Sequence, residues 1–345
     1  MYCANINRFK LIVNFEHFFN IPKTQKLVKV YHSIDQFPSD IKSVLTLGTF
    51  DGVHKGHKYV LKRMNEIAEK EDGESVLLTF YPHPRHVLQP EDQKLKLLNT
   101  IEEKINELEK SGIQHFVIHE FTKDFSRTKS VNFIRDLLVN KLKMKYMVVG
   151  YDHHFGRNRE GSYDELIELS ELYNFKLEQM PPQDEGDVTV SSTKIRKLLS
   201  AGNIEKANTY LGYNYPINGV VVKGNKIGRT LTYPTANILI ENKWKLLPGD
   251  GVYVVSVILE SKQYFGMLNI GKKPTLNEGK HSVEVHIFDF SADVYDSEIK
   301  VEFIKQIRDE KQFNSLEDLQ SQLKIDENNC RKFLAIINEN NNFCE

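Results

Sequence analysis

The chain has 345 residues, 40% of them hydrophobic, which predicts about two globular domains with apolar cores. Its 46 lysines and arginines nearly balance its 47 aspartates and glutamates, which excludes a global field favouring nucleic acid or an anionic membrane. The three cysteines include no C-x-x-C pair, which argues against a disulfide framework or a zinc site, and no apolar run reaches the roughly 18 residues that span a bilayer.

The residues before about Val28 have no counterpart in the patterns described below. Their apolar run is interrupted by Asn14, Glu16 and His17, and no small-residue cleavage site follows it. We therefore expect no export signal, and we treat residues 1–27 as an unmatched N-terminal extension of a cytoplasmic protein. A misassigned start codon and a mobile extension explain this segment equally well.

From Val44 onward, strand-like apolar runs alternate with helix-like ones. The strand-like runs are 44–50, 75–84, 115–121 and 146–152, and the helix-like runs are 57–70, 98–112 and 130–142. This alternation predicts a parallel sheet covered by helices, with ligands bound at the carboxyl ends of the strands. Two further helices are expected at 192–200 and 204–211, with Ser191 or Ser192 as the N-cap of the first.

After residue 217 the pattern changes to short alternating strands separated by Gly, Pro and Asn turns. They lie at 218–224, 235–240, 251–259, 263–271, 281–290 and 299–308. This predicts an antiparallel barrel or sandwich. The segment 315–337 has helical periodicity, and we expect it to pack across this β unit.

The first chemical constellation is the turn after the first strand, in which His54 and His57 stand at the start of a helix. Free backbone N–H groups and the helix dipole favour an anion there, and imidazoles add donors. A phosphate whose oxygens gain charge in a transition state is the natural partner. Gly48, Gly52 and Gly56 would let the backbone approach a nucleotide closely. The alternative is a solvated turn with two incidental histidines.

The stretch GTFDGVHKGH, Gly48 to His57, resembles the signature of the HxGH nucleotidyltransferase superfamily. The resemblance implies a Rossmann-like α/β domain that transfers a nucleotidyl group from ATP or CTP to a phosphate or carboxylate and releases pyrophosphate. It also implies that Phe50 and Asp51 belong to the nucleotide site. The motif alone leaves the acceptor open.

Hydroxyl and basic side chains gather at the predicted helix start VSSTKIRKLL, where Ser192, Thr193 and Arg196 suit departing phosphates. The stretch resembles the superfamily's second motif, although a capped surface helix remains the alternative. The segments TFYPHPRHVL and VVGYDHHFGRNREGS follow strands and should also reach the crevice. They resemble the flavin-specific branch, in which Asp152 and Arg159 would bind nucleotide, although His153 replaces an aromatic residue of that pattern.

The β unit carries a second constellation. A glycine-rich basic turn, which includes Gly224, Gly228 and Arg229, precedes Thr235 and Asn237. These last two are two residues apart, so on an extended segment their oxygens point the same way and could share a hard cation with ATP phosphates. A polar-faced strand is the alternative.

A carboxylate in the strand HSVEVHIFDF is the candidate base of this unit. Val283, Val285 and Ile287 alternate with Glu284, His286 and Phe288, so Glu284 and His286 share a face. A carboxylate on a rigid strand can take a proton from an attacking hydroxyl. Taken alone, a residue such as Glu284 is more often a solvated strand residue than a base.

The stretches PTAN, NIGKKPT and VEVHIFDF, in this order after an HxGH domain, resemble riboflavin kinase. Together the motifs resemble the bacterial bifunctional riboflavin kinase/FAD synthetase. This implies Mg-ATP-dependent phosphorylation of riboflavin to FMN, then adenylylation of FMN to FAD. Thr235 and Asn237 would hold Mg²⁺ and phosphates, and Glu284 would be the base. His54 and His57 would stabilise the α-phosphate, and Ser192, Thr193 and Arg196 would engage pyrophosphate.

The resemblance divides the chain into an FMN adenylyltransferase domain at 28–203, a helical linker at 204–214 and a kinase domain at 215–345. The expected partners are riboflavin, FMN and ATP, without nucleic acid or membrane. Thr232 departs from the family because glycine is usual there. A glycine with positive φ would resist threonine, whereas one with negative φ would tolerate it.

Two rival hypotheses remain at this stage. One is a nucleotidyltransferase for another phosphorylated acceptor, such as phosphopantetheine, with an accessory β unit. The other is a flavin-binding regulatory protein without turnover. The PTAN and EVH motifs count against the first, and the intact His54, His57, Asn237 and Glu284 count against the second.

Overall fold

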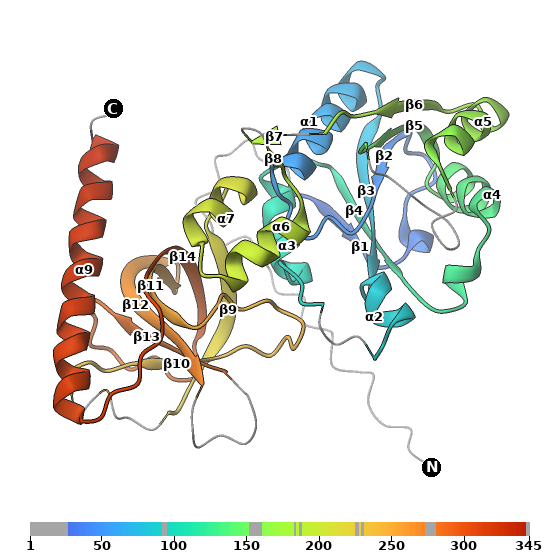
Figure 1. Ribbon diagram of the computed structural model, residues 1–345. Helices are drawn as coiled ribbons and strands as arrows, with labels where there is room; N and C mark the ends of the chain where they lie inside the picture. Colours follow the sequence, from blue (N-terminus) through green and yellow to red (C-terminus); the bar gives the residue numbers. More distant parts are fainter. Residues whose placement is uncertain are drawn as a thin grey trace, which may run out of the picture.

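The structure is a computed structural model of the 345-residue chain. It describes residues 27–91, 95–151, 161–182, 184–185, 188–224, 228, 231–272 and 281–342. Figure 1 shows an α/β unit beside a β unit, joined through helices α6 and α7, with helix α9 along the outer side of the β unit.

The N-terminal unit is a parallel sheet with the strand order β1-β4-β3-β2-β5-β6, which confirms the predicted α/β class. Its strands are β1 (Lys29–Tyr31), β2 (Ser43–Leu47), β3 (Glu74–Tyr81), β4 (His115–Glu120), β5 (Met144–Val149) and β6 (Lys176–Gln179). The central strand β2 is buried along its whole length, as expected for a sheet covered on both faces. The edge strands β1 and β6 were not predicted because they are too short to show a period.

Helices cover both faces of this sheet. On one face α1 (Lys55–Lys70) and α3 (Ile101–Glu109) pack through Met64 and Leu108. On the other face α5 (Tyr163–Tyr173) and the segment after β4 pack through Leu166 and Leu138. The remaining short elements of this unit are η2 (Ile34–Gln36), α2 (Pro84–Leu88), η3 (Phe125–Arg127), and the hairpin β7 (Asp184–Glu185) and β8 (Val188–Thr189).

The segment 130–142 differs from the regular helix that we predicted. It is one turn of α-helix, α4 (Ser130–Asn132), continued by the π-helix η4 (Phe133–Lys141), whose last N–H bond runs from Leu142 to the carbonyl of Leu137. The wider π-turn brings Phe133, Ile134 and Leu138 into the core. Tertiary packing therefore overrides the period of the local sequence.

Helices α6 (Ser192–Ser200) and α7 (Ile204–Leu211) begin and end at the predicted residues. The N-cap of α6 is Ser191, whose hydroxyl accepts the N–H of Lys194 at 3.4 Å, so Ser192 is free of the capping role. Both helices bury apolar residues in the core of the β unit, including Leu199 and Leu211.

The β unit is a closed antiparallel barrel with the order β10-β13-β12-β11-β14-β9, which selects the barrel from the two predicted architectures. Its strands are β9 (Tyr215–Val222), β10 (Ala236–Leu239), β11 (Gly251–Leu259), β12 (Lys262–Lys272), β13 (His281–Ile287) and β14 (Glu298–Arg308). Strand β9 starts at Tyr215 rather than at the predicted Asn218. Pro216 is tolerated there because β10 pairs only with Val220–Val222, which leaves that end of β9 paired on one side.

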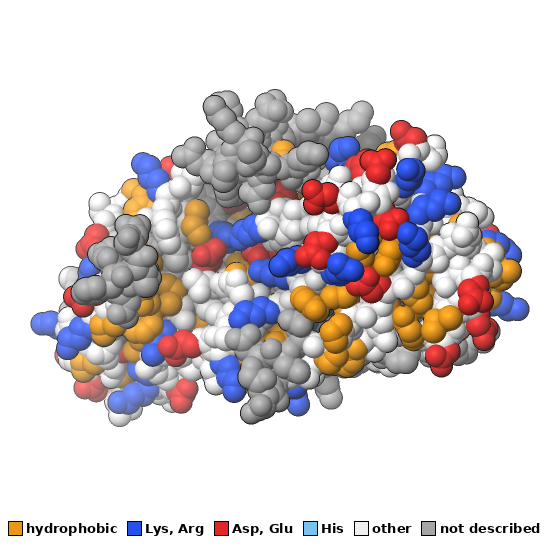
Figure 2. All heavy atoms as spheres, turned by 90° about the horizontal axis from the view of Figure 1, so that it is seen from above, with side chains coloured by type: hydrophobic (Ala, Val, Ile, Leu, Met, Phe, Trp, Pro, Cys, Tyr) orange, Lys and Arg blue, Asp and Glu red, His pale blue; other side chains and the backbone are white. Residues whose placement is uncertain are grey.

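Helix α9 (Leu316–Asn342) lies along the barrel, as the periodicity predicts. Arg308 on β14 holds Asp326 of this helix in an ion pair of 2.8 Å, and Cys330 of the same helix is fully buried in a cluster with barrel residues. Among the described residues, no helix combines the length and apolarity needed to cross a membrane. On the face in Figure 2, basic and acidic side chains are interspersed, as the small net charge predicts.

Candidate active sites

The turn after β2 is a tight backbone structure that requires glycine at one position. Gly52 has φ +90°, and a Cβ there would lie 2.6 Å from Leu98 Cδ1. Phe50 and Val53 also have positive φ values, of 43° and 34°. Non-glycine residues rarely adopt such angles, and they concentrate at functional sites where the surrounding structure enforces them. The surrounding structure therefore enforces the conformation of this turn.

His54 and His57 lie together where α1 begins. His54 is the N-cap, and its Nδ1 accepts the N–H of His57 at 3.4 Å. The two rings stack with their centroids 3.7 Å apart, and Phe50 stacks on His57 at 4.5 Å. The histidines and Phe50 of the predicted motif thus form one aromatic stack at a helix N-terminus.

Burial keeps both imidazoles neutral at pH 7. Desolvation lowers the pKa of His54 to about 4, and the same cause, followed by His54 itself, holds the pKa of His57 well below its usual value. A neutral imidazole whose Nδ1 accepts a bond carries its proton on Nε2. His54 can therefore donate one hydrogen bond to an anion without bringing a charge, and the positive electrostatics come from the helix N-terminus.

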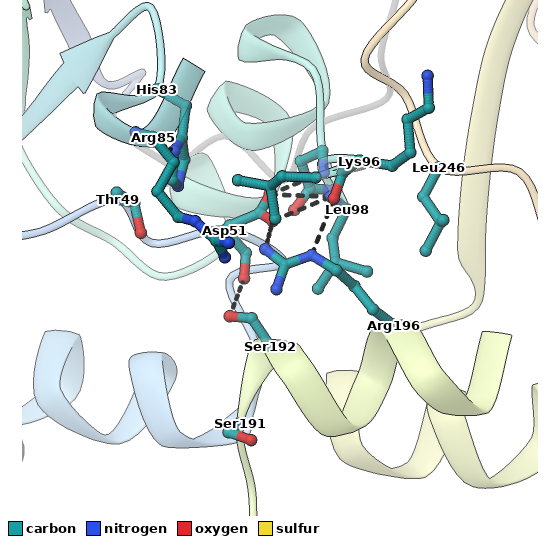
Figure 3. Close-up of polar contacts among 12 residues, drawn as sticks. Thr49, Asp51, His83, Arg85, Lys96, Leu98, Ser191, Ser192, Arg196 and Leu246 are labelled. Atoms are coloured by element: carbon teal, nitrogen blue, oxygen red, sulfur yellow. Dashed lines mark hydrogen bonds and ion pairs between the residues drawn. The ribbon is translucent and has the colours of Figure 1, made fainter. Parts of the chain in front are cut away.

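Asp51 connects the turn to two other segments, as Figure 3 shows. Its side chain is 3% exposed, and the carboxylate accepts the backbone N–H groups of Leu98 at 3.0 Å and Asn99 at 3.2 Å. Arg196 of α6 donates to the same carboxylate at 2.5 Å and to the carbonyl of Lys96 at 2.8 Å. This network sets the position of α6 relative to the turn.

Two of the three residues predicted to engage pyrophosphate, Ser192 and Arg196, therefore already have protein partners. The hydroxyl of Ser192 donates to the carbonyl of Asp51 at 2.8 Å, whereas the side chain of Thr193 is exposed. In the part of the chain that the structure describes, Arg196 contacts Asp51 and Lys96 through Nη2 and Nε. Two other predicted nucleotide ligands, Asp152 and Arg159, lie outside the described residues.

A pocket lies at the carboxyl ends of β2 and β3, beside Asp51. Its lining combines aromatic, aliphatic and polar side chains: Thr49, Asp51, Phe80, Tyr81, His83, Leu97, Asn99, Thr100, Ile101, Lys104 and Asn242. Burial lowers the pKa of Lys104 to about 8, and its ammonium group donates to the carbonyl of Thr49 at 2.6 Å. Sequence reasoning missed Lys104 and Asn99, because charged and amide residues near a helix start are normally solvated.

The barrel brings together Thr235, Asn237 and Glu284. Asn237 faces Glu284 across the β10 and β13 pair, and the hydroxyl of Thr235 lies 3.3 Å from Glu284 Oε2. The alternating burial of β13 confirms that Glu284 and His286 share a face, with Val283, Val285 and Ile287 on the other. All three side chains carry hard oxygen atoms, the ligands that suit Mg²⁺ bound to ATP phosphates.

The loop before these residues needs glycine at Gly228, where a Cβ would lie 2.2 Å from the backbone carbonyl oxygen of Tyr233. A Cβ on Gly224 would lie 2.2 Å from Asn237 Nδ2, so a larger residue there would displace the Asn237 side chain. Thr232, which replaces the expected glycine, has φ +65° and so occupies the left-handed region. Arg229 lies outside the described residues.

Comparison with family models matches both units. Residues 36–194 match the model described as FAD synthetase, and residues 211–334 match the model described as riboflavin kinase. Two matches that together span most of the chain agree with the two candidate sites, one in each unit.

Curated relatives align along nearly their whole length. The chain is 35% identical over 312 residues to the bifunctional riboflavin kinase/FMN adenylyltransferase of Escherichia coli K12, covering 90% of this chain and 98% of that protein. It is 34% identical over 318 residues to the protein of the same name from Bacillus subtilis 168, covering 91% and 98%.

A solved structure from Streptococcus pneumoniae, titled a macrolide-efflux protein, has a TM-score of 0.81 and 31% identity to this chain. The match covers 88% of this chain and 99% of that one, so the two proteins share the arrangement of both units.

Proposed function

The chain belongs to the family of bifunctional riboflavin kinases/FMN adenylyltransferases, and we propose that its two reactions are carried by the two sites described above. It phosphorylates riboflavin to FMN and adenylylates FMN to FAD, with ATP as the second substrate in both steps. The observation that carries the residue assignment is the stacked pair of neutral histidines at the N-terminus of α1.

In adenylyl transfer, an oxygen of the FMN phosphate attacks the α-phosphorus of ATP, and the bond to the α,β-bridging oxygen breaks. Pyrophosphate leaves with that oxygen. His54 and His57 donate hydrogen bonds to the α-phosphate oxygens, which gain charge in the transition state. Gly48, Gly52 and Gly56 let the backbone approach the nucleotide. Ser192 and Thr193 lie at the start of α6, whose N-terminus favours the leaving pyrophosphate.

In the kinase reaction, the ribityl 5′-hydroxyl of riboflavin attacks the γ-phosphorus of ATP, and the bond to the β,γ-bridging oxygen breaks to release ADP. Glu284 accepts the hydroxyl proton. Gly224 and Gly228 allow the preceding loop to approach the ATP phosphates, with Arg229 adding positive charge.

Thr235 and Asn237 would hold Mg²⁺ together with ATP phosphates in the kinase site. Their fit rests on the oxygen donors that they present beside the Glu284 carboxylate. When bound, the ion neutralises charge on the phosphate oxygens. Glu284 accepts the proton of the ribityl hydroxyl, and the other residues of the site orient riboflavin.

We assign residues 28–203 to the adenylyltransferase domain, 204–214 to a helical linker and 215–345 to the kinase domain. The breaks fall at the helix pair α6 and α7, which packs on the barrel core. We also assign the enzyme to the cytoplasm, because a reducing compartment suits its free Cys330. The rival hypotheses of another acceptor and of a binder without turnover are not favoured by relatives that carry both activities in their names.

The test uses the full-length protein with riboflavin and Mg-ATP, and separates the flavins by chromatography over time. FMN should appear first and FAD later. Riboflavin and FMN that both stay unchanged would overturn the proposed function.

Two variants separate the sites. Glu284→Gln should lower FMN formation roughly 10²- to 10⁴-fold while FMN supplied directly still becomes FAD. His57→Ala should lower FAD formation about 10²- to 10³-fold and leave FMN formation intact. If either variant impaired both reactions equally, the assignment of one site to each domain would be wrong.

A further inference from the structure

Side chains from four separate segments donate hydrogen bonds to the backbone carbonyl oxygens of the HxGH turn, residues 48–57. The pairs are Thr79 to Gly48 at 2.9 Å, Lys104 to Thr49 at 2.6 Å, Ser192 to Asp51 at 2.8 Å and Tyr213 to Gly52 at 2.6 Å. The first three donors come from β3, α3 and α6 of the adenylyltransferase domain. Tyr213 differs, because it belongs to the linker that leads into the kinase barrel. The linker therefore contacts the turn directly.

The peptide group between Gly52 and Val53 is hydrogen-bonded at both ends. Its carbonyl accepts the Tyr213 hydroxyl, and its N–H donates to the carbonyl of Phe50 at 3.3 Å. Gly52 has φ +90°, and a glycine restricts the rotation of its peptide groups less than any other residue does. The residue that follows is His54, the N-cap of α1. The two hydrogen bonds therefore limit how far the backbone that carries His54 can move.

The surroundings of Tyr213 keep its hydroxyl protonated. Burial, and after it the charge of Glu107, raises the pKa of Tyr213 well above its usual value. The ammonium group of Lys58 lies 4.7 Å from the centroid of the ring and 3.4 Å from Glu107 Oε2, so α1 and α3 both border the phenol. The hydroxyl oxygen also lies 3.3 Å from Asn99 Oδ1. Tyr213 is therefore a hydrogen-bond donor throughout the neutral pH range.

Docking of the kinase domain on the adenylyltransferase domain holds the linker in place. The side chains of Lys245 and Glu103 are each 1% exposed, and the ammonium group lies 2.5 Å from Glu103 Oε2. The carbonyl of Trp244 accepts the N–H of Leu97 at 2.6 Å, and its ring stacks on His86 with the centroids 3.8 Å apart. Since the chain has one tryptophan, its fluorescence reports whether this contact is intact.

We propose that Tyr213 of the linker is a positioning residue for adenylyl transfer, whose hydroxyl fixes the peptide group after Gly52 so that His54 faces the α-phosphate of ATP. The inference rests on the proposed function of this histidine. The α-phosphate oxygens gain charge in the transition state, so a donor whose position varies lowers kcat more than it raises KM. The kinase site lies in the barrel, so its reaction should not depend on Tyr213.

The test compares Tyr213→Phe with wild type in the full-length protein. The substitution removes the hydroxyl and keeps the ring. Tyr253→Phe is the matched control, because it removes a hydroxyl that donates to the carbonyl of Gly249 within the kinase domain. Adenylyl transfer is measured with FMN and Mg-ATP each varied, and kinase activity with riboflavin and Mg-ATP. Urea unfolding and Trp244 emission are recorded for each protein.

Tyr213→Phe should lower kcat for FAD formation about tenfold, the effect of losing one hydrogen bond of roughly average strength, while both KM values and the kinase reaction change less than about twofold. Its Trp244 emission should match wild type. Tyr253→Phe should lose comparable stability and keep kcat for FAD formation. An unchanged kcat in Tyr213→Phe, an equal fall in its kinase reaction, or an equal fall of kcat in Tyr253→Phe would each overturn the inference.

A double-variant cycle tests whether the Tyr213 hydroxyl acts through His54. In a His54→Ala background, Tyr213→Phe should lower kcat less than about threefold, because the donor that it positions is gone. An equal loss in both backgrounds would overturn the inference, since the hydroxyl would then act on another group. A wild-type protein that makes no FAD from FMN would overturn the proposed function instead, and this inference with it.

Discussion

Arg196 of α6 and Asp51 of the HxGH turn form an ion pair of 2.5 Å, with the carboxylate side chain 3% exposed. The contact joins residues 145 positions apart in the sequence. It makes the second motif a structural support for the first, in addition to any contact with phosphates. The predictions below begin from this pair.

Arg196→Ala should destabilise the N-terminal domain by about 3 kcal/mol. The reason is that the buried carboxylate of Asp51 then keeps only its backbone N–H partners and loses its ion-pair partner. Urea unfolding followed by far-UV circular dichroism measures the change. Lys197→Ala, on the exposed side of the same helix, is the control and should alter stability by less than about 0.5 kcal/mol. Equal stability of the two variants would mean that the pair contributes nothing.

Lys245→Met should destabilise the contact between the domains by roughly 3 to 5 kcal/mol, because Glu103 is left as an unpaired buried charge. The double variant Lys245→Met with Glu103→Gln should recover part of this loss. Trp244 emission during urea unfolding follows the contact directly. If the single and double variants unfolded at the same urea concentration, the loss of stability in Lys245→Met would not come from the unpaired charge of Glu103.

Thr232→Gly should stabilise the barrel by about 0.5 to 1 kcal/mol. Thr232 has φ +65°, a conformation that costs a β-branched residue of order 1 to 3 kcal/mol. Glycine removes this strain but loses more backbone entropy on folding, which offsets part of the gain in stability. Thr232→Ala retains a Cβ and most of the strain, so it should give little gain. Thermal unfolding of the two variants distinguishes backbone strain from a loss of side-chain contacts.

Stability should fall as the pH is lowered from about 6.5 to 4. In the folded protein the pKa of His54 is about 4, so in this window the unfolded chain binds a proton that the folded chain does not, and unfolding is favoured. The contribution of His54 is about 3 kcal/mol over the window. Urea midpoints at pH 7 and 4.5 measure it, and His54→Asn should flatten the dependence. An equal slope in the variant would show that other groups dominate.

The two-domain organisation was predictable because each part relies on a local pattern. Helices α6 and α7 carry caps and apolar periods, and β13 alternates between buried and half-buried residues. The HxGH turn was predictable because its glycines and histidines lie within ten residues. The sequence left open whether the backbone at position 232 has a positive or a negative φ. The structure gives Thr232 a positive φ, the case in which a glycine would resist replacement by threonine.

The pocket wall was not predictable, because it is assembled from segments far apart in the chain. Lys245 and Glu103 are ordinary charged residues in sequence, and only docking of the two domains buries them. Lys104 and Asn242 are likewise unremarkable until tertiary packing brings them to one pocket. The π-helix at Phe133–Lys141 has the same cause, since the core selects it over the regular period.

The two large sheets that the structure describes differ in their exposure to aggregation. The barrel is closed and so offers no open edge to another chain, whereas the parallel sheet ends at β1 and β6. Those strands have 3 and 4 residues, and β6 carries Lys176 and Glu178. Short, charged edge strands are poor templates for pairing with a second molecule, so the fold protects concentrated protein against edge-to-edge association.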